Sequence, residues 1–260
     1  MRAFLAIVVS TSFLSCVPIT TTGSGPGTPS AAVIRTGDQL LAAMHRRYAD
    51  SWYRTLTFVQ KSTYYRPDGS ILRTETWYEA AKLPGRLRID IGEPSGGNGA
   101  LYRSDSIYMM RGGRVAQGRR EINPMLTLGF DVYRQSPQET AEQLRRMAFT
   151  GSLRVDTLDG RRVYVVGATR GDSVTNQFWV DAERLLFVRA IQTISGQTRD
   201  MRFERYTQYD GGWVAETVRI LNGGRLAFLE EYSRVQVNDD LPDDLFLPER
   251  WNAATHWYRP

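Results

Sequence analysis

The stretch WYEAAKLPGRLRIDI, residues 77–91, contains the pattern on which the fold depends. Its second half alternates: Leu87, Ile89 and Ile91 fall on one side, and the charged residues between them fall on the other. Successive side chains of a β-strand point to opposite faces, so this spacing predicts a strand with one buried and one polar face.

The same period of two extends over most of the chain. LTFVQKSTYY (56–65) and ILRTETWYEA (71–80) flank the turn sequence RPDGS, and further strand-like runs continue from SLRVDTL (152–158) to RLAFLEEYSRVQV (225–237). The runs are joined by short turns such as DGR, SGQT and NGG. Turns this short join only antiparallel neighbours, so the pattern predicts a long antiparallel meander.

Helical spacing interrupts this meander in two places. The first lies near the start, where Leu40, Leu41 and Met44 recur at helical spacing and Asp38 is the expected N-cap. The second lies in the middle, where Asn123-Pro124 and the capping sequence SPQE predict helices over 124–133 and 137–147. About five strands precede these central helices, and six or seven follow them.

A long meander with one apolar face must cover that face. We therefore expect a mainly β (α+β) domain built on a single antiparallel, strongly curved sheet. This sheet is expected to form an unclosed half-barrel of about eleven strands, with three helices covering or plugging its concave apolar face. The convex face is expected to be polar.

The N-terminal residues are typical of an exported protein. Met1-Arg2 precedes the short apolar run AFLAIVV (3–9), and FLSC (13–16) resembles the lipobox of bacterial lipoproteins, with Cys16 as the lipid-bearing residue. The alternative is ordinary cleavage nearby, with Cys16 discarded or left as a free thiol. Residues 17–36 are built mainly from Pro, Gly, Thr and Ser, as in a flexible linker.

These observations divide the chain into four parts: a signal peptide (1–15), a lipid-anchored flexible tether (16–36), a folded domain (37–250) and a C-terminal tail (251–260). We expect the protein to be anchored in the outer membrane and to face the periplasm. The delivery to the outer membrane rests on what lipoprotein sorting implies for a chain with Val17, not an acidic residue, after the cysteine. The alternative location is the soluble periplasm.

Composition and charge exclude some classes of function. The formal net charge is +5, but the basic residues are spread among acidic ones along the chain. They form no cluster interleaved with aromatic residues, as a nucleic-acid groove would need. We therefore expect no nucleic acid among the partners.

Few residues of this chain are suited to catalysis. The two histidines, His45 and His256, lie in the first helix and near the C-terminus, and the single cysteine belongs to the leader region. The parts of a Ser-His-Asp triad or a Cys-His pair are therefore missing, and the acidic DDLPDD (239–244) departs from a calcium loop. We expect no catalytic residues, no metal site and no cofactor.

Three stretches resemble the lipoprotein carriers and receptors of the LolA and LolB-like superfamily. WYEAAKLPGRLRIDI (77–91) is similar to its strand, Pro-Gly turn and Arg-containing strand, FWVDAERLLFVRA (178–190) to its aromatic-x-Asp hairpin, and VQVNDDLPDDLFLP (235–248) to its closing segment. The likeness covers about residues 36–250. It implies a monomer that binds acylated lipoproteins or lipids, although an anchored Cys16 departs from the pattern of the soluble carriers.

An acyl-chain site requires a concave apolar lining. From the strand and helix patterns, the candidate lining residues are Leu87, Ile89, Met125, Leu128, Phe178, Val180, Leu186, Val188 and Phe203. The same residues could instead fill a closed core. Two other functions stay open at this point: an envelope sensor or assembly scaffold of the same fold, and an enzyme on this scaffold.

The predicted anchor leads to a direct test. Changing Cys16→Ala removes the thiol that would carry the lipid, so the protein should move from the membrane fraction to the soluble periplasmic fraction. Its circular dichroism should not change, because the tether lies outside the expected domain. Unchanged membrane fractionation of the variant would contradict lipidation at Cys16.

Overall fold

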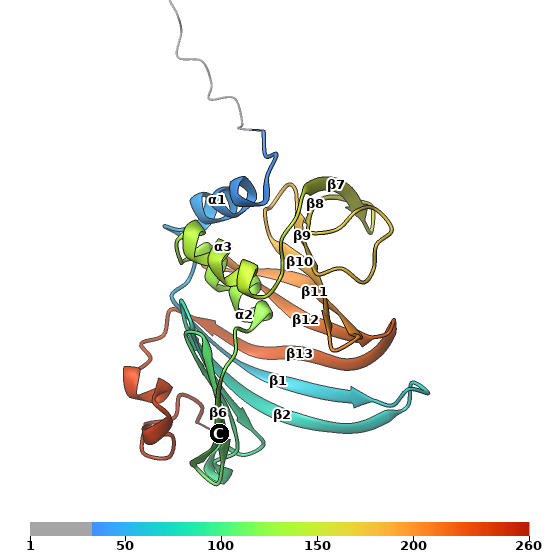
Figure 1. Cartoon of the computed structure of the whole chain (residues 1–260). Coiled ribbons are helices and arrows are strands. Elements are labelled where there is room, and N and C mark those ends of the chain that lie inside the picture. The colour runs from blue at the N-terminus through green and yellow to red at the C-terminus, as the bar shows by residue number, and fades with distance from the viewer. Residues whose placement is uncertain (1–32, 260) are drawn as a thin grey trace, which may run out of the picture. The chain divides into compact units, whose positions relative to one another are not determined.

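Within residues 33–259, all thirteen strands belong to one antiparallel sheet, in the order β6-β5-β4-β3-β2-β1-β13-β12-β11-β10-β9-β8-β7 (Figure 1). This computed structural model describes residues 33–259. The predicted signal peptide, Cys16 and most of the predicted tether lie outside the described residues. The folded unit extends from Ile34 to Pro260.

Six strands come before the central helices. They are β1 (Thr55–Tyr65), β2 (Ile71–Lys82), β3 (Arg86–Ile91), β4 (Gly99–Arg103), β5 (Ser106–Arg111) and β6 (Arg114–Arg120). From β2 onward, each pairs with the strand before it, as the sequence pattern predicts. β6 ends the sheet at one edge.

Seven strands follow the helices. They are β7 (Leu153–Leu158), β8 (Arg161–Val166), β9 (Gln177–Asp181), β10 (Phe187–Ile194), β11 (Gln197–Tyr209), β12 (Gly212–Asn222) and β13 (Arg225–Val237). The meander starts again at the opposite edge with β7 and works inward until β13 pairs with β1. The sheet is therefore unclosed, as expected, and has thirteen strands in place of about eleven.

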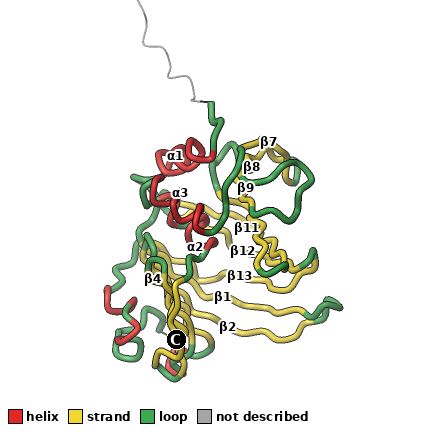
Figure 2. The backbone as a smooth tube through the Cα atoms, in the orientation of Figure 1, coloured by secondary structure: helices red, strands yellow, loops and turns green. Residues whose placement is uncertain are grey.

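Three helices lie along the concave side of the sheet (Figure 2). They are α1 (Gly37–Tyr48), α2 (Pro124–Gly129) and α3 (Pro137–Arg146), and a short 3-10 helix, Asp131–Tyr133, joins the last two. The predicted caps of the central helices are present: Asn123 accepts from the amides of Met125 and Leu126, and Ser136 accepts from that of Glu139.

The predicted cap of the first helix is wrong by two residues. The Thr36 hydroxyl, not the Asp38 carboxylate, accepts the hydrogen bond from the Gln39 amide. Asp38 lies in the first turn of α1, where its negative charge interacts favourably with the helix dipole.

The main core lies between the helices and the concave face of the sheet. Leu40 and Met44 of α1, Leu128 of α2 and Leu144 of α3 are at most 2% exposed and pack with apolar residues of β9–β12. The apolar stripe of each helix thus covers the concave apolar face, which is the arrangement expected from the sequence.

The convex face differs from expectation over β2–β5, because the C-terminal segment covers it. Leu241, Leu245, Phe246 and Trp251 pack there against Ala80 and other outward-facing strand residues. In Figure 1 this segment, coloured red, lies beside β6 and away from α1. Residues 251–259, expected to form a tail, thus include a fully buried tryptophan.

Two charged residues of the opening stretch, Arg88 and Asp90, are therefore buried. Arg88 is 2% exposed and Asp90 is fully buried, and two hydrogen bonds of 2.8 and 2.9 Å join their side chains. The Arg88 guanidinium also donates to the carbonyl of Trp251 at 3.1 Å and stacks 3.9 Å from its ring centre. His256 Nε2 lies 3.0 Å from Asp90 Oδ2. The pair buried on this face is well hydrogen-bonded, which offsets its desolvation.

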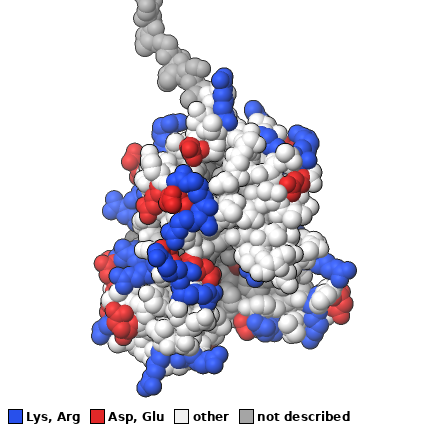
Figure 3. Space-filling view, in the orientation of Figure 1, with Lys and Arg blue, Asp and Glu red and all other residues white. Residues whose placement is uncertain are grey.

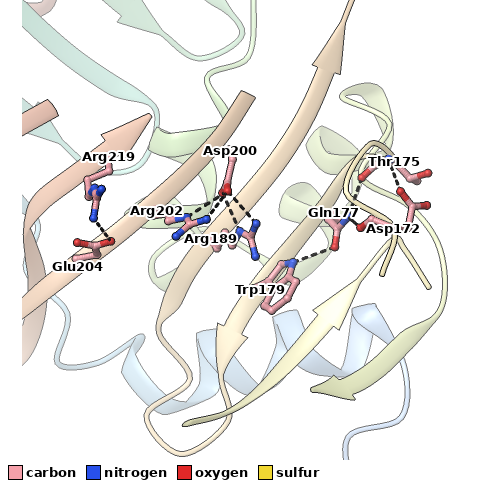
Figure 4. Close-up of polar contacts among 9 residues, drawn as sticks. All are labelled: Asp172, Thr175, Gln177, Trp179, Arg189, Asp200, Arg202, Glu204 and Arg219. Atoms are coloured by element: carbon pink, nitrogen blue, oxygen red, sulfur yellow. Dashed lines mark hydrogen bonds and ion pairs between the residues drawn. The ribbon is translucent and has the colours of Figure 1, made fainter. Parts of the chain in front are cut away.

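The convex face of β9–β12 carries ion pairs that range from largely buried to exposed (Figure 4). Asp200 accepts from Arg189 Nε at 2.7 Å and from Arg202 Nη2 at 2.9 Å. Burial alone would raise the pKa of Asp200, but these hydrogen bonds outweigh it and lower the pKa. Arg189 also stacks over Trp179, 4.7 Å from the ring centre. The cluster is self-satisfied and supports the sheet.

The C-terminal cover leads to a stability prediction. Trp251→Ala removes the buried ring over Arg88, so it should lower the free energy of unfolding by about 3–5 kcal/mol, as for other buried tryptophans. Urea denaturation followed by circular dichroism measures this change. The control is Trp257→Ala, which removes a half-buried ring of the same segment and should cost less. Equal, small effects would mean that the segment contributes little to folding.

A candidate ligand cavity

An apolar cavity of about 340 Å³ lies between α2 and the sheet. Inward-facing residues of β3–β5 form one wall, and they include Leu87, Ile89, Ile91, Ala100, Ile107 and Met109. Residues of α2 and of β11–β13 form the rest, among them Met125, Phe203 and Phe228. The sequence RLRIDI alternates charged and aliphatic residues, and successive residues of a strand point to opposite faces. The aliphatic residues of β3 therefore face the cavity, and its charged residues face the C-terminal segment.

The structure places the nine candidate lining residues in three different environments. Leu87, Ile89, Met125 and Phe203 border the cavity. Four others, Leu128, Phe178, Val180 and Leu186, are at most 1% exposed, belong to the main core and lie outside the cavity lining. Val188 packs with Val163, Val165 and Trp179 in a small cluster on the convex face.

The helices explain this division. α1 and α3 pack against the half of the sheet around β9 and β10 and fill it, whereas α2 is only six residues long and leaves space beneath it. The period of two predicts which face a side chain occupies, but the length of the covering helix decides whether that face is filled.

Two buried carboxyl groups in the lining were missed by the sequence analysis. Glu79 of β2 and Glu230 of β13 are 5% and 6% exposed and both border the cavity. Each stands in the inward phase of its strand, two residues from an aromatic lining residue, Trp77 or Phe228. The sequence therefore contained a signal for both residues, because each is a carboxyl at an inward position of an otherwise apolar strand face.

Burial dominates the titration of these two groups. It raises the pKa of Glu230 to about 7, against the opposing effect of the Tyr232 hydroxyl, which donates to Glu230 Oε2 at 2.7 Å. Burial also raises the pKa of Glu79 well above its usual range, and the neighbouring charge of Glu230 adds to this shift. Loss of hydration disfavours the ionised form of each.

Two polar residues of β1 lie between the strands that carry the two carboxyls. Gln60 lies opposite Trp77 on β2 and Tyr232 on β13, and Ser62 lies opposite Glu230. Both side chains are at most 1% exposed, and the Gln60 amide donates to the Ser62 hydroxyl at 2.8 Å. Gln60 and Ser62 do not border the cavity, but Glu79, Glu230 and Tyr232 do, and they form a narrow polar band on a largely apolar surface, as small-molecule sites commonly have.

Charged residues gather at the rim. Arg119 Nε donates to Glu121 Oε2 at 2.8 Å, and Arg120 and Arg146 both pair with Asp105. Burial raises the pKa of the nearby Tyr102 to about 12, so its hydroxyl stays neutral at physiological pH. Figure 3 shows basic and acidic side chains mixed on this face, beside a hollow in the surface.

The histidines lie away from this cavity. His45 belongs to α1, and His256 contacts Asp90 on the convex face. Among residues 33–259, no group of three or more His, Cys, Asp or Glu side chains is arranged to hold a metal ion. In the same part of the chain, no helix is both long and apolar enough to cross a membrane.

Solved structures with the same fold include a LolA superfamily protein from Nitrosomonas europaea (TM-score 0.51, 16% identity, covering 79% of this chain and 96% of that one). A DUF1329 family protein from Desulfovibrio piger has a TM-score of 0.54 at 16% identity and covers 81% of this chain and 95% of its own. A domain described as an outer membrane lipoprotein-sorting protein, from Vibrio parahaemolyticus, has a TM-score of 0.56 at 13% identity and covers 83% and 98%.

These likenesses confirm the fold that the three sequence stretches indicate, over about four fifths of the chain. No protein-family model matches the sequence. No curated protein matches it either.

The raised pKa values lead to a prediction about pH. A carboxyl that stays protonated in the folded state stabilises it below its unfolded pKa, and this stability is lost as the pH rises through the folded pKa. For Glu230, whose folded pKa is about 7, the loss falls between about pH 4.5 and 7 and amounts to about 3 kcal/mol.

The variant Glu230→Gln, which mimics the neutral acid and can still accept from Tyr232, should lose this dependence and be more stable than the parent at neutral pH. Urea denaturation from acid to neutral pH measures the difference between the two proteins. Burial also raises the pKa of Asp131 to about 7, so Asp131 titrates in the same pH range in the parent and in the variant. Only the difference between the two stability curves therefore reports on Glu230. Parallel stability curves would contradict the assignment to Glu230.

Proposed function

We propose that this protein is an envelope protein that holds the acyl chains of lipoproteins or lipids in the cavity beneath α2, for lipoprotein sorting or lipid transfer. The observation that carries the proposal is the cavity itself, an apolar concave site of about 340 Å³ with a narrow polar band. Its lining is formed by the side chains that the sheet turns away from water on its concave side.

The energetics favour such a ligand. Each CH2 group moved from water into an apolar site contributes about 0.8 kcal/mol, so part of an acyl chain suffices for useful affinity. Met109 and Met125 lie in the lining, and their flexible side chains adapt to chains of different shape. The site is proposed to bind without catalysing a reaction, since neither histidine borders it.

The proposed location is the cell envelope. The support is the leader-like N-terminus, with Cys16 as the proposed lipid anchor and residues 17–36 as a tether. Two of the neighbours with this fold carry names from lipoprotein sorting: the LolA superfamily protein and the sorting domain. The tether would let a monomeric domain reach a cargo lipoprotein away from its own membrane.

A cavity-filling variant tests this function. Met109→Trp places a large ring in the apolar lining, so it should weaken binding of an acylated peptide by about tenfold, the equivalent of about two CH2 groups. The control is Val174→Trp, in a loop where the side chain is 58% exposed and outside the lining. Fluorescence titration measures both, with the same peptide lacking its acyl chain as the reference ligand.

Saturable binding that depends on the acyl chain and is weakened only by Met109→Trp supports the proposal. If the folded protein does not distinguish the acylated from the unacylated peptide, the cavity is not an acyl-chain site.

A further inference from the structure

We propose that this cavity selects amphiphiles whose polar head is an amine, with the ammonium group at Glu79 and Glu230 and the hydrocarbon chain along β3–β5. This inference rests on the proposed function, since it specifies which amphiphile the same cavity takes. It follows from the surroundings of the two buried carboxyls, since within residues 33–259 no cation pairs with either of them.

Glu79 is a buried acid without a partner. Its side chain is 95% buried, and within residues 33–259 no hydrogen bond or ion pair involves its carboxyl group. The residues directly opposite it on the neighbouring strands are apolar, Phe58 on β1 and Ile89 on β3. Arg119, the only cation in the lining formed by the described residues, is paired with Glu121 at the rim.

Glu230 has one hydrogen-bond partner more than Glu79. It accepts one hydrogen bond from the Tyr232 hydroxyl, and its cross-strand neighbours are Ser62 on β1 and Val218 on β12. A buried carboxylate is normally paired with a cation or bound to a metal. Both groups instead border an apolar cavity large enough for a ligand, which is where a cation could be supplied from outside.

Aromatic rings surround the same place. Trp77 and Phe228 lie with their ring centres 5.6 Å apart, and Phe58 stacks on Tyr232 at 4.1 Å. All four rings border the cavity. Aromatic faces attract ammonium groups, most strongly where water is excluded. A site with carboxyls and aromatic faces suits an organic cation better than a neutral or anionic head group.

The preference for an amine can be measured through the protons that binding releases. In the empty cavity the carboxyls hold their protons at mildly acidic pH, because burial raises the pKa of each. An alkylammonium ion that pairs with one of them displaces its proton, so binding releases up to one proton to the buffer. A neutral alcohol of the same length releases none, and a carboxylate head meets two acids and no free cation.

The other titratable groups of the lining do not supply this signal. Tyr102 and Tyr232 remain neutral because burial raises the pKa of each, to about 12 for Tyr102 and well above the usual range for Tyr232. Arg119 and Glu121 form an ion pair with each other. A proton released on binding therefore comes from Glu79 or Glu230.

The experiment compares dodecylamine, dodecanol and dodecanoate by isothermal titration calorimetry in two buffers of different ionisation enthalpy, at mildly acidic pH. The full chain is used, and each ligand is kept below its solubility limit or micelle concentration. We expect the amine to bind about tenfold or more tightly than the alcohol, with release of a proton. Glu79→Gln should reduce this preference and the proton release.

A second variant supplies the cation from the protein itself. Ile89→Lys places an ammonium group on β3 opposite Glu79, so dodecylamine should lose its advantage over dodecanol. Ile89→Met is the matched neutral variant and should retain the preference. Circular dichroism of each variant establishes that it is folded, and the ratio of the two affinities in one protein cancels any general change in the cavity.

The outcomes separate the two proposals. If none of the three ligands binds, the proposed function fails. If amine and alcohol bind equally without proton release, or if the carboxylate binds most tightly, the selectivity for amines is overturned while the acyl-chain function stands. Amine preference that is lost in Glu79→Gln and Ile89→Lys but kept in Ile89→Met supports the inference.

Discussion

The pairing of β1 with β13 is the constraint on which this structure depends. Residues from Leu56 to Tyr64 pair with residues from Val237 to Phe228, and this ladder is the one connection between a six-stranded and a seven-stranded half within the described part of the sheet. It joins segments about 170 residues apart in sequence, so the chain must close a long loop before the cavity can form. Glu79 comes from one half and Glu230 from the other, and only this ladder brings them to a common site.

Both faces of the sheet are covered, but with different results. On the concave side, α1 and α3 fill the space over β9 and β10, while the short α2 leaves a cavity over β1–β5. On the convex side of β2–β5, the C-terminal segment packs against the strands and encloses Arg88 and Asp90. Strand β3 therefore borders the cavity on one side and packs against the C-terminal segment on the other. Its apolar residues face the first and its charged residues face the second.

The buried charges on the two sides of the sheet differ in a way that relates to function. Arg88 and Asp90 satisfy each other, with further hydrogen bonds from the C-terminal segment, so they support the fold. Glu79 and Glu230 lie beside an apolar cavity where burial disfavours their ionised forms, so at neutral pH they cost stability. Such a cost persists in proteins where the unpaired groups serve a ligand. The cavity acids are thus the part of the sheet where stability and binding are in conflict.

The sequence by itself determined the class of the fold and the face of most strand residues. The period of two, the short turns and the capping residues Asn123 and Ser136 are local signals, and local signals predict strands, antiparallel neighbours and helix starts. They also placed Leu87, Ile89, Met125 and Phe203 on the side where the cavity lies. The tertiary structure alone decided the rest. Whether an inward residue lines a cavity or fills a core depends on the helix above it, and whether Arg88 meets water or Trp251 depends on a segment about 160 residues away. The local spacing of residues predicts neither the helix that covers an inward residue nor the segment that covers Arg88. Both come from parts of the chain that meet the strand only after the sheet has formed.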